Sequence, residues 1–254
     1  MTSPLRYPGG KTRACKLLWT FIPPSTKTLI SPFFGGGSFE LFCANKGIDV
    51  YGNDSFQPLS VFWNTLKNET EELVEATELI RPLSKAEFYR IRQSILTLDD
   101  PILVAAYYFA INRSSFSGST FCGGYAPQAA EGRFTESSIE RLRTTKMKNI
   151  KSVENYDFEE FIEMHPPSNN TILFLDPPYY ISNYLYGKDG DHHESFRHET
   201  LSNMLKDRKD WILCYNDCEY IRNLYKDCRI EKVEWAYGMN KTKESNEIVI
   251  RPAI

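Results

Sequence analysis

The fold class of this chain is decided by one stretch, Thr171-Ile172-Leu173-Phe174-Leu175-Asp176-Pro177-Pro178-Tyr179-Tyr180. Its apolar run with a β-branched start is typical of a buried strand in a parallel sheet. The strand must end at Asp176, because the two prolines that follow lack an N–H for the sheet ladder and have a fixed φ. An acid, a rigid turn and an aromatic ring thus stand at the carboxyl end of a strand, which is the edge where open α/β sheets bind ligands.

Such a corner suits chemistry on the exocyclic amino group of an aromatic ring. The lone pair of that amine is delocalised into the ring, which makes the nitrogen a poor nucleophile. The Asp176 carboxylate and the Pro177 carbonyl can accept its two hydrogens, which favours a pyramidal nitrogen with a free lone pair. Pro178 helps to fix these acceptors, and Tyr179 can stack on the base with roughly 1–3 kcal/mol. The alternative is an ordinary strand-end turn in which Asp176 caps a helix.

A strand–helix–strand unit is predicted near the amino end of the chain. Residues 27–33 have the pattern of a buried strand. The tight loop Phe34-Gly35-Gly36-Gly37-Ser38 then opens a helix, for which Gly47 suits the C′ position. Residues 48–53 predict the second strand, which ends at Asp54. Strands and helices that alternate in this way predict an α/β fold with a parallel sheet.

The residues that follow the two strands of this unit predict the kind of ligand. Asp54 can bind ribose hydroxyls, while the glycine loop lets the ligand approach the backbone. The dinucleotide pattern G-x-G-x-x-G is not met, since Glu40 stands where the third glycine belongs. A nucleoside without a pyrophosphate is therefore the better ligand. The alternative is that the glycines only make a sharp turn.

The Gly-Lys-Thr at residues 10–12 is similar to part of a phosphate-binding loop. That interpretation fails, because Leu5 stands at the required first glycine and no strand precedes the motif. A glycine turn that caps the following helix is the alternative.

The composition is that of an ordinary globular protein, with 254 residues, 41% hydrophobic and 25% charged. A chain of this length forms one large domain or one domain with an insert. The net charge of −3 argues against a nonspecific nucleic-acid coat but leaves room for a local basic face. No apolar run approaches a membrane span, and the first residues lack a signal core, so we expect an intracellular protein with no membrane partner.

The alternation of strands and helices is lost between residues 57 and 150, where helical patterns dominate. One of these helices is predicted to begin at Asp100 and Pro101, which are a capping residue and a proline at the first helical position. We therefore predict a catalytic domain formed by residues 1–56 and 151–254. Residues 57–150 are a mostly helical region inserted into it.

A polar loop and a basic stretch in this inserted region are candidates for nucleic-acid contacts. Residues 112–125 are rich in glycine and serine, with interleaved aromatics and no burial pattern. Residues 133–151 carry six bases against Glu136 and Glu140, a local charge of +4. This combination suits phosphate and base contacts, whereas a solvated helix face is the alternative. The candidate residues are Asn112, Arg113, Ser115, Ser117, Arg133, Arg141, Arg143 and Lys146.

The carboxyl-terminal part returns to strands. Residues 181–198 are polar and contain three histidines and Glu194, but no metal-ligand spacing such as H-E-x-x-H. We therefore expect a loop near the substrate there and no metal site. Residues 210–217 predict a strand with a polar end, and residues 229–237 and 247–251 predict a closing pair of strands.

Four motifs follow one another in a recognisable order. They are Arg6-Tyr7-Pro8-Gly9-Gly10-Lys11, Pro32-Phe33-Phe34-Gly35-Gly36-Gly37-Ser38, Asp54, and Asp176-Pro177-Pro178-Tyr179. In this order they resemble the motifs of the Dam-like, D12 class DNA adenine N6-methyltransferases. Ser245-Asn246-Glu247-Ile248-Val249-Ile250 is similar to the last strand motif of that family. One residue departs from the pattern, since the family usually has an acid where this chain has Ser31.

The resemblance implies a Rossmann-like methyltransferase sheet with helices on both faces and a target-recognition region at residues 57–150. It implies S-adenosylmethionine as the methyl donor, S-adenosylhomocysteine as the product, and no metal. Asp176, Pro177, Pro178 and Tyr179 would be catalytic. The donor would be bound by Tyr7, Lys11, Phe34, Gly35, Gly37, Asp54 and Asp176.

The partner implied by the resemblance is double-stranded DNA, together with a cognate restriction nuclease. The target adenine would be flipped out of the duplex at a cost of a few kcal/mol. The methyl group would then pass in line to N6, largely by positioning. Alternatives with the same fold are a cytosine-N4 or an RNA amino-methyltransferase, and a further alternative is a nucleic-acid-binding module whose catalytic site is vestigial. A nicotinamide-dependent oxidoreductase is disfavoured by Glu40.

Overall fold

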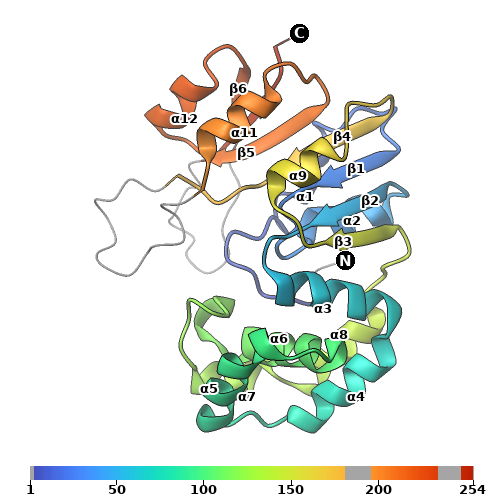
Figure 1. Cartoon of the computed structure of the whole chain (residues 1–254), viewed down its shortest axis with the longest axis vertical. Coiled ribbons are helices and arrows are strands. Elements are labelled where there is room, and N and C mark those ends of the chain that lie inside the picture. The colour runs from blue at the N-terminus through green and yellow to red at the C-terminus, as the bar shows by residue number, and fades with distance from the viewer. Residues whose placement is uncertain (1–2, 181–195, 234–246, 254) are drawn as a thin grey trace.

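The strand that ends at Asp176, β4 (Thr171–Leu175), lies in the middle of a seven-stranded sheet with the order β3-β2-β1-β4-β5-β7-β6 (Figure 1). This is a computed structural model that describes residues 3–180, 196–233 and 247–253. The five strands from β3 to β5 are parallel, and β7 pairs antiparallel with β5 and with β6. The other strands are β1 (Thr28–Ser31), β2 (Asp49–Asn53), β3 (Ile150–Glu154), β5 (Trp211–Asn216), β6 (Arg229–Val233) and β7 (Glu247–Arg251).

The predicted strand–helix–strand unit is confirmed at β1, α2 (Ser38–Asn45) and β2. Gly37 precedes α2 with a φ of +62°, a left-handed conformation that glycine adopts without steric cost. A Cβ at Gly37 would lie 2.7 Å from the ring of Phe34, so the close packing of this loop also requires a glycine. Gly47 follows α2 with a φ of +91°, as expected for a C′ glycine.

Helices cover both faces of the sheet, as predicted, because successive side chains of a strand point to opposite faces. Leu173 and Leu175 of β4 pack into one hydrophobic core, and Ile172 and Phe174 pack into the other. The helices of the first core are α9 (Phe158–Glu163), α11 (His198–Leu205) and α12 (Glu219–Leu224). The helices that join α2 on the second face include α1 (Cys15–Trp19).

The region between β2 and β3 is helical and forms the lower half of the molecule in Figure 1. Its helices are α3 (Gln57–Asn68), α4 (Thr70–Ile80), α5 (Lys85–Ser94), α6 (Pro101–Ser114), α7 (Pro127–Arg133) and α8 (Glu136–Thr144), with short 3₁₀ turns at Ile95–Thr97 and Phe116–Gly118. Asp100 caps α6 by accepting hydrogen bonds from the N–H groups of Ile102 and Leu103, as its position before Pro101 predicts. The buried side chains of this region belong to the same core as α2, so the insert packs onto one face of the sheet.

The sequence patterns were wrong or incomplete at two places. The polar loop was expected to begin at residue 112, but helix α6 runs to Ser114, and residues 112–115 are buried. Strand β3 was not recognised, because its half-buried pattern of polar and apolar residues lies inside the basic stretch. Residues 181–195 of the loop expected at 181–198, and residues 234–237 of the strand expected at 229–237, lie outside the described residues. No helix in the described ranges is both long and apolar enough to span a membrane.

Candidate active site

Asp176 follows the last residue of β4, at the carboxyl edge of the sheet. Its side chain is 22% exposed, and its Oδ1 lies 2.8 Å from the Nζ of Lys11. Pro177 is buried and Pro178 is exposed, while Tyr179 is half-buried against the sheet. The predicted acid, rigid turn and ring therefore stand together at one corner, and the amino-terminal motif supplies the charge that balances the acid.

Lys11 is the centre of a buried polar network and is only 3% exposed. Its Nζ donates hydrogen bonds to the hydroxyl of Tyr179 (2.8 Å) and to the carbonyl of Gly9 (3.1 Å). The Tyr179 hydroxyl in turn donates to Oε2 of Glu247, at 2.7 Å. Glu247 is 2% exposed at the start of β7, and its Oε2 lies 3.9 Å from Lys11 Nζ. The network thus ties the amino-terminal motif, the Asp176 corner and the last strand together.

The electrostatics of this network follow from burial and from opposite charges in contact. Burial lowers the pKa of Lys11, but the contact with Asp176 and the nearby acidic groups, Glu247 among them, together outweigh this effect, and the pKa lies above its ordinary value. Burial raises the pKa of Asp176, and the contact with Lys11 works against this rise. Burial, together with Asp176 and Glu247, raises the pKa of Tyr179, so its hydroxyl keeps its proton. We therefore treat Lys11 and Asp176 as an ion pair beside a neutral phenol.

The glycine loop lies between Tyr7 and Asp54. The N–H of Gly35 donates to Oδ2 of Asp54 (2.9 Å). A Cβ on Gly36 would lie 2.5 Å from the Cβ of Tyr7, so the absence of side chains lets Tyr7 lie directly on the loop. Phe34, whose ring packs edge-on against Trp63, anchors the loop in the core. The structure thus brings the sequence-predicted residues Tyr7, Phe34, Gly35, Gly37 and Asp54 to one place.

A cavity of about 270 Å³ opens at the same sheet edge, between the ends of β1, β2 and β4. Phe33, Phe158 and Phe196 form part of its wall and pack on one another with ring centroids 5.1 to 5.6 Å apart. Asp157, which caps α9, stands at its rim. Neither Asp157 nor Phe158 was predicted from the sequence. The signal that could have found them is an Asp at a helix start shortly after a parallel strand.

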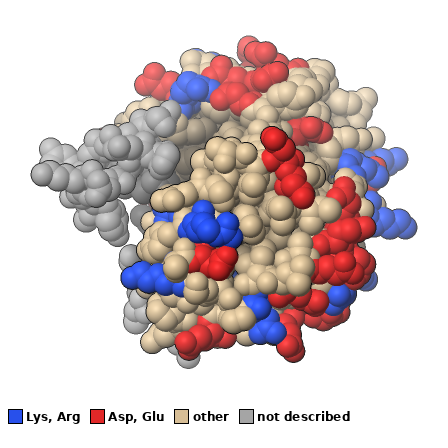
Figure 2. All heavy atoms as spheres, turned by 60° about the horizontal axis from the view of Figure 1, so that its bottom comes forward, with Lys and Arg blue, Asp and Glu red and all other residues tan. Residues whose placement is uncertain are grey.

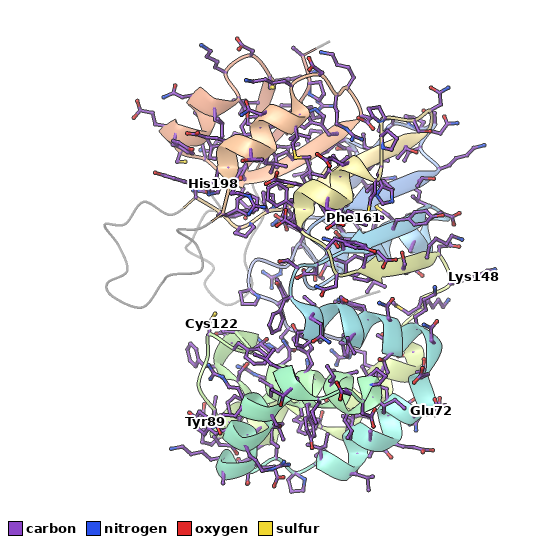
Figure 3. All side chains as sticks on the ribbon, in the orientation of Figure 1. Glu72, Tyr89, Cys122, Lys148, Phe161 and His198 are labelled. Atoms are coloured by element: carbon purple, nitrogen blue, oxygen red, sulfur yellow. The ribbon has the colours of Figure 1, made fainter. Side chains whose placement is uncertain are left out.

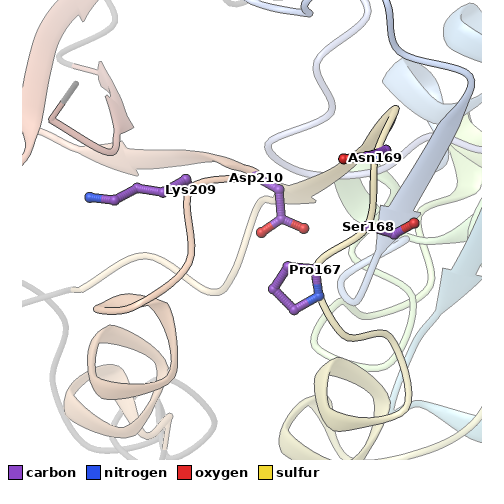
Figure 4. Close-up of a pocket in the computed structure, with 5 residues that line it drawn as sticks. All are labelled: Pro167, Ser168, Asn169, Lys209 and Asp210. Carbon is purple, nitrogen blue, oxygen red and sulfur yellow. The ribbon is translucent and has the colours of Figure 1, made fainter.

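A second cavity, of about 450 Å³, is not a candidate for the same chemistry (Figure 4). Its lining residues precede β4 and β5 and therefore lie at the amino edge of the sheet, opposite Asp176. They are Pro167, Ser168, Asn169, Lys209 and Asp210.

Ser31, the residue that departs from the motif pattern, contacts a carboxylate of helix α2. The Ser31 hydroxyl donates to Oε1 of Glu40 (2.8 Å), and both side chains are buried. Burial raises the pKa of Glu40 to about 7, although its own backbone N–H and Ser31 oppose the rise. A carboxyl group therefore stands behind the glycine loop after all, and it titrates near neutral pH.

This raised pKa predicts how stability depends on pH. Between the ordinary pKa of 4.5 and the folded value of about 7, the folded chain holds a proton on Glu40 that the unfolded chain has lost. The free energy of unfolding should therefore fall as pH rises through this window. Glu40→Gln removes this pH-dependent contribution. As pH rises from 5 to 8, the free energy of unfolding of the variant should therefore increase relative to that of the wild type by on the order of 2 kcal/mol. Urea unfolding of both proteins at the two pH values measures this, and parallel pH profiles would contradict it.

The candidate nucleic-acid residues of the loop are in part buried. Asn112 accepts a hydrogen bond from the N–H of Arg6 (3.0 Å) and donates to its carbonyl (2.7 Å). Arg113 donates to the carbonyl of Arg133 (2.9 Å), and Ser115 is 1% exposed. The expectation that this loop lacks a burial pattern is therefore wrong, because Asn112 joins it to Arg6 of the amino-terminal motif and Arg113 joins it to Arg133. Ser117, by contrast, is exposed.

The loop nevertheless lies at the edge of the insert that faces the sheet. Cys122, which belongs to it, lies on the side of the helical region that faces the sheet (Figure 3). Burial, and then the charges of Arg141, Arg6 and Arg133, lower the pKa of Arg113 to about 10, so three further arginines lie near Arg113 at this edge.

The basic stretch does not form one continuous patch. In Figure 2 the Lys and Arg side chains of the insert occur in small groups among Asp and Glu. Arg143 on α8 contacts Glu71 and Glu140, each at 2.9 Å, so its charge is neutralised within the protein. Arg141 and Lys146 are exposed and Arg133 is half-buried. In the described part of the chain, Arg141 has no acid within ion-pair distance.

Comparisons with known proteins agree with this arrangement. The sequence profile of the D12 class N6 adenine-specific DNA methyltransferases matches residues 7–239. The chain is also similar to the type II methyltransferase M.CviBI of Paramecium bursaria Chlorella virus NC1A. The two are 24% identical over 230 residues, which cover 87% of this chain and 85% of the relative. The family match includes the glycine loop, the helical insert and the Asp176 corner.

Proposed function

We infer the roles of individual residues from one premise: this chain belongs to the D12 class of N6 adenine-specific DNA methyltransferases. It is a site-specific DNA methyltransferase that acts on N6 of adenine. This membership decides between the alternatives that the sequence left open, because the family methylates adenine and not cytosine, and DNA and not RNA. The methyl donor, the acceptor and the DNA can then each be assigned to a part of the structure.

For the methyl donor we propose S-adenosylmethionine, bound along the carboxyl edge of the sheet. The residues fit such a ligand: the aromatic cavity suits an adenine ring, Asp157 can accept from its amino group, and Asp54 can accept from ribose hydroxyls. Tyr7 packs on the glycine loop and Lys11 contacts Asp176, and both would face a donor that extends from this cavity to Asp176. When bound, the donor supplies an activated methyl group, which needs no metal ion or covalent enzyme intermediate.

For the acceptor we propose that the target adenine enters beside Asp176. The observation that carries this proposal is the carboxylate of Asp176, held by Lys11 at 2.8 Å next to the rigid Pro177 carbonyl. Lys11 contacts Oδ1, which leaves Oδ2 to accept one N–H of the adenine amino group, and the Pro177 carbonyl accepts the other. The ring of Tyr179 stacks on the base. Its hydroxyl bonds, one from Lys11 and one to Glu247, set the plane of that ring before the base arrives.

We propose double-stranded DNA as the substrate and residues 57–150 as its target-recognition region. An adenine in a duplex reaches the Asp176 corner only when it is flipped out, which costs a few kcal/mol. The positive edge at Arg113, Arg133 and Arg141 is suited to the phosphates beside the flipped base. Ser117 is the exposed candidate of the loop for a contact near the bases, and Lys146 is a further exposed candidate for phosphate.

Two arginines on α8 give a matched test of these DNA contacts. Arg141→Gln should weaken duplex binding about threefold to tenfold. It should also reduce the steepness of the plot of log association constant against log salt concentration by about 1, because one phosphate contact is lost. Arg143→Gln should change neither quantity, since Glu71 and Glu140 already neutralise Arg143. Fluorescence anisotropy at several salt concentrations measures both. Equal slopes for the two variants would contradict the assignment of Arg141.

The type II name of the relative supports one further proposal, that a cognate restriction nuclease is a partner of this enzyme. An enzyme that methylates DNA works where DNA is, so we also propose an intracellular location. The experiment that tests the proposed function is sequencing, with modified-base detection, of DNA from cells that express the protein. We expect N6-methyladenine at one short sequence, in both strands of duplex DNA. DNA without any modified base would contradict the proposal.

A further inference from the structure

Arg197 joins the starts of two helices at the aromatic cavity. It directly precedes α11, and it lines the cavity together with Asp157 and Phe158 at the start of α9. Its guanidinium donates one hydrogen bond to Oδ1 of Asp157 (2.7 Å) and another to Oε1 of Glu159 (2.6 Å). The same group lies over the ring of Phe158, 5.0 Å from the ring centroid. One side chain thus contacts both the polar rim and the aromatic wall of the cavity.

These contacts are too exposed to contribute much to the stability of the fold. The side chains of Arg197 and Asp157 are 49% and 48% exposed, and that of Glu159 is 37% exposed. An ion pair in such a position contributes about 0–1 kcal/mol, because water screens the charges. The planar guanidinium nevertheless fixes a geometry, since its N–H groups point in set directions. We therefore look for the effect of Arg197 in the shape of the cavity, and we expect its variants to fold.

The two carboxylate oxygens of Asp157 are used differently. Oδ1 accepts from the N–H of Glu159 (3.0 Å), which caps α9, and from Arg197. These two donors use both lone pairs of Oδ1. Oδ2 receives no hydrogen bond from any residue that the structure describes. Because a carboxylate only accepts, Oδ2 is suited to a ligand group that donates, such as the amino group of an adenine ring.

We infer that Arg197 is a positioning residue for the methyl donor, an inference that rests on the proposed function. It holds the Asp157 carboxylate by Oδ1, so that Oδ2 is set to accept from the amino group of the donor's adenine. Without Arg197 the carboxylate is free to turn toward water, while the aromatic walls of the cavity stay in place. A variant without this guanidinium therefore still binds a purine ring but distinguishes its amino group less well.

The test compares two ligands that differ only in the amino group, S-adenosylhomocysteine and its analogue with unsubstituted purine in place of adenine. Calorimetry gives the ratio of the Kd of the analogue to the Kd of S-adenosylhomocysteine, without any turnover. This ratio should be about 10 or more for the wild type, and Arg197→Gln should lower it about fivefold. Arg222→Gln is the matched control: Arg222 is 46% exposed, makes two hydrogen bonds to Asp217 and does not line the cavity, so the ratio should stay unchanged.

A second substitution tests whether Arg197 acts through Asp157. Asp157→Ser keeps a residue that caps a helix, but the shorter side chain does not reach the amino group, so the ratio should fall close to 1. Adding Arg197→Gln to Asp157→Ser should then change the ratio by less than about twofold, because no carboxylate is left to position. A ratio unchanged in Arg197→Gln, or a fivefold difference between the double variant and Asp157→Ser, overturns the inference. A wild type that binds neither ligand would overturn the proposed function as well, whereas a wild type that binds both equally overturns this inference alone.

Discussion

Replacing Asp176 by alanine is expected to lower methyl transfer by at least about a thousandfold while donor binding is retained. The carboxylate is the group that accepts from the adenine amine, and a methyl side chain accepts nothing. The glycine loop, Asp54 and the aromatic cavity do not depend on Asp176 for their geometry. Transfer of a labelled methyl group to duplex DNA measures the rate, and calorimetry measures the binding.

The control for this prediction is Asp49→Ala. Asp49 lies at the amino end of β2 and pairs with Lys151 at the surface, so its loss removes an acid of the same sheet away from the site. This variant should methylate at nearly the wild-type rate. Transfer by Asp176→Ala within about tenfold of the wild type would show that the carboxylate has no direct part in the reaction.

The second large effect is expected in stability. Lys11→Met should lower the free energy of unfolding by about 3 kcal/mol, because it leaves Asp176 and Glu247 without their common counter-charge in a buried place. The value lies at the low end of the usual range because Asp176 is 22% exposed and water relieves part of the cost. The variant should also lose methyl transfer, since Asp176 and Tyr179 are no longer held in place. Urea unfolding followed by circular dichroism measures the stability.

Lys16→Met provides the comparison for Lys11. Lys16 lies on α1 with its side chain exposed, so the same substitution there should change stability by no more than about 0.5 kcal/mol. If Lys11→Met were as stable as Lys16→Met, the ion pair would not be a structural element of the site.

The fold followed from local patterns of the sequence. The apolar run before Asp176 predicted a central parallel strand because both of its faces are buried, and β4 packs into two separate cores. Gly37 and Gly47 marked the two ends of α2, because each needs a positive φ. Strand β3 was missed, since it lies at the edge of the sheet and only Ile150 and Val153 of its residues are buried.

The site could be predicted only where residue type and place in the chain both carry information. Asp176 and Asp54 were found because an acid directly after a buried strand is a local signal. Glu247 was not, because its role depends on contacts with Lys11 and Tyr179, which are far away in the sequence. For the same reason Asn112 was expected to face DNA: nothing local shows that its amide bonds the backbone of Arg6, 106 positions away.

The central claim is that the Asp176 corner directs a methyl group to the amino nitrogen of adenine in duplex DNA. Its most direct test is mass spectrometry of nucleosides from duplex DNA, after incubation with the purified protein and S-adenosylmethionine that carries a deuterated methyl group. We predict deuterated N6-methyladenine with the wild type and none with Asp176→Ala. Deuterated N4-methylcytosine, or equal amounts of N6-methyladenine from both proteins, would contradict the claim.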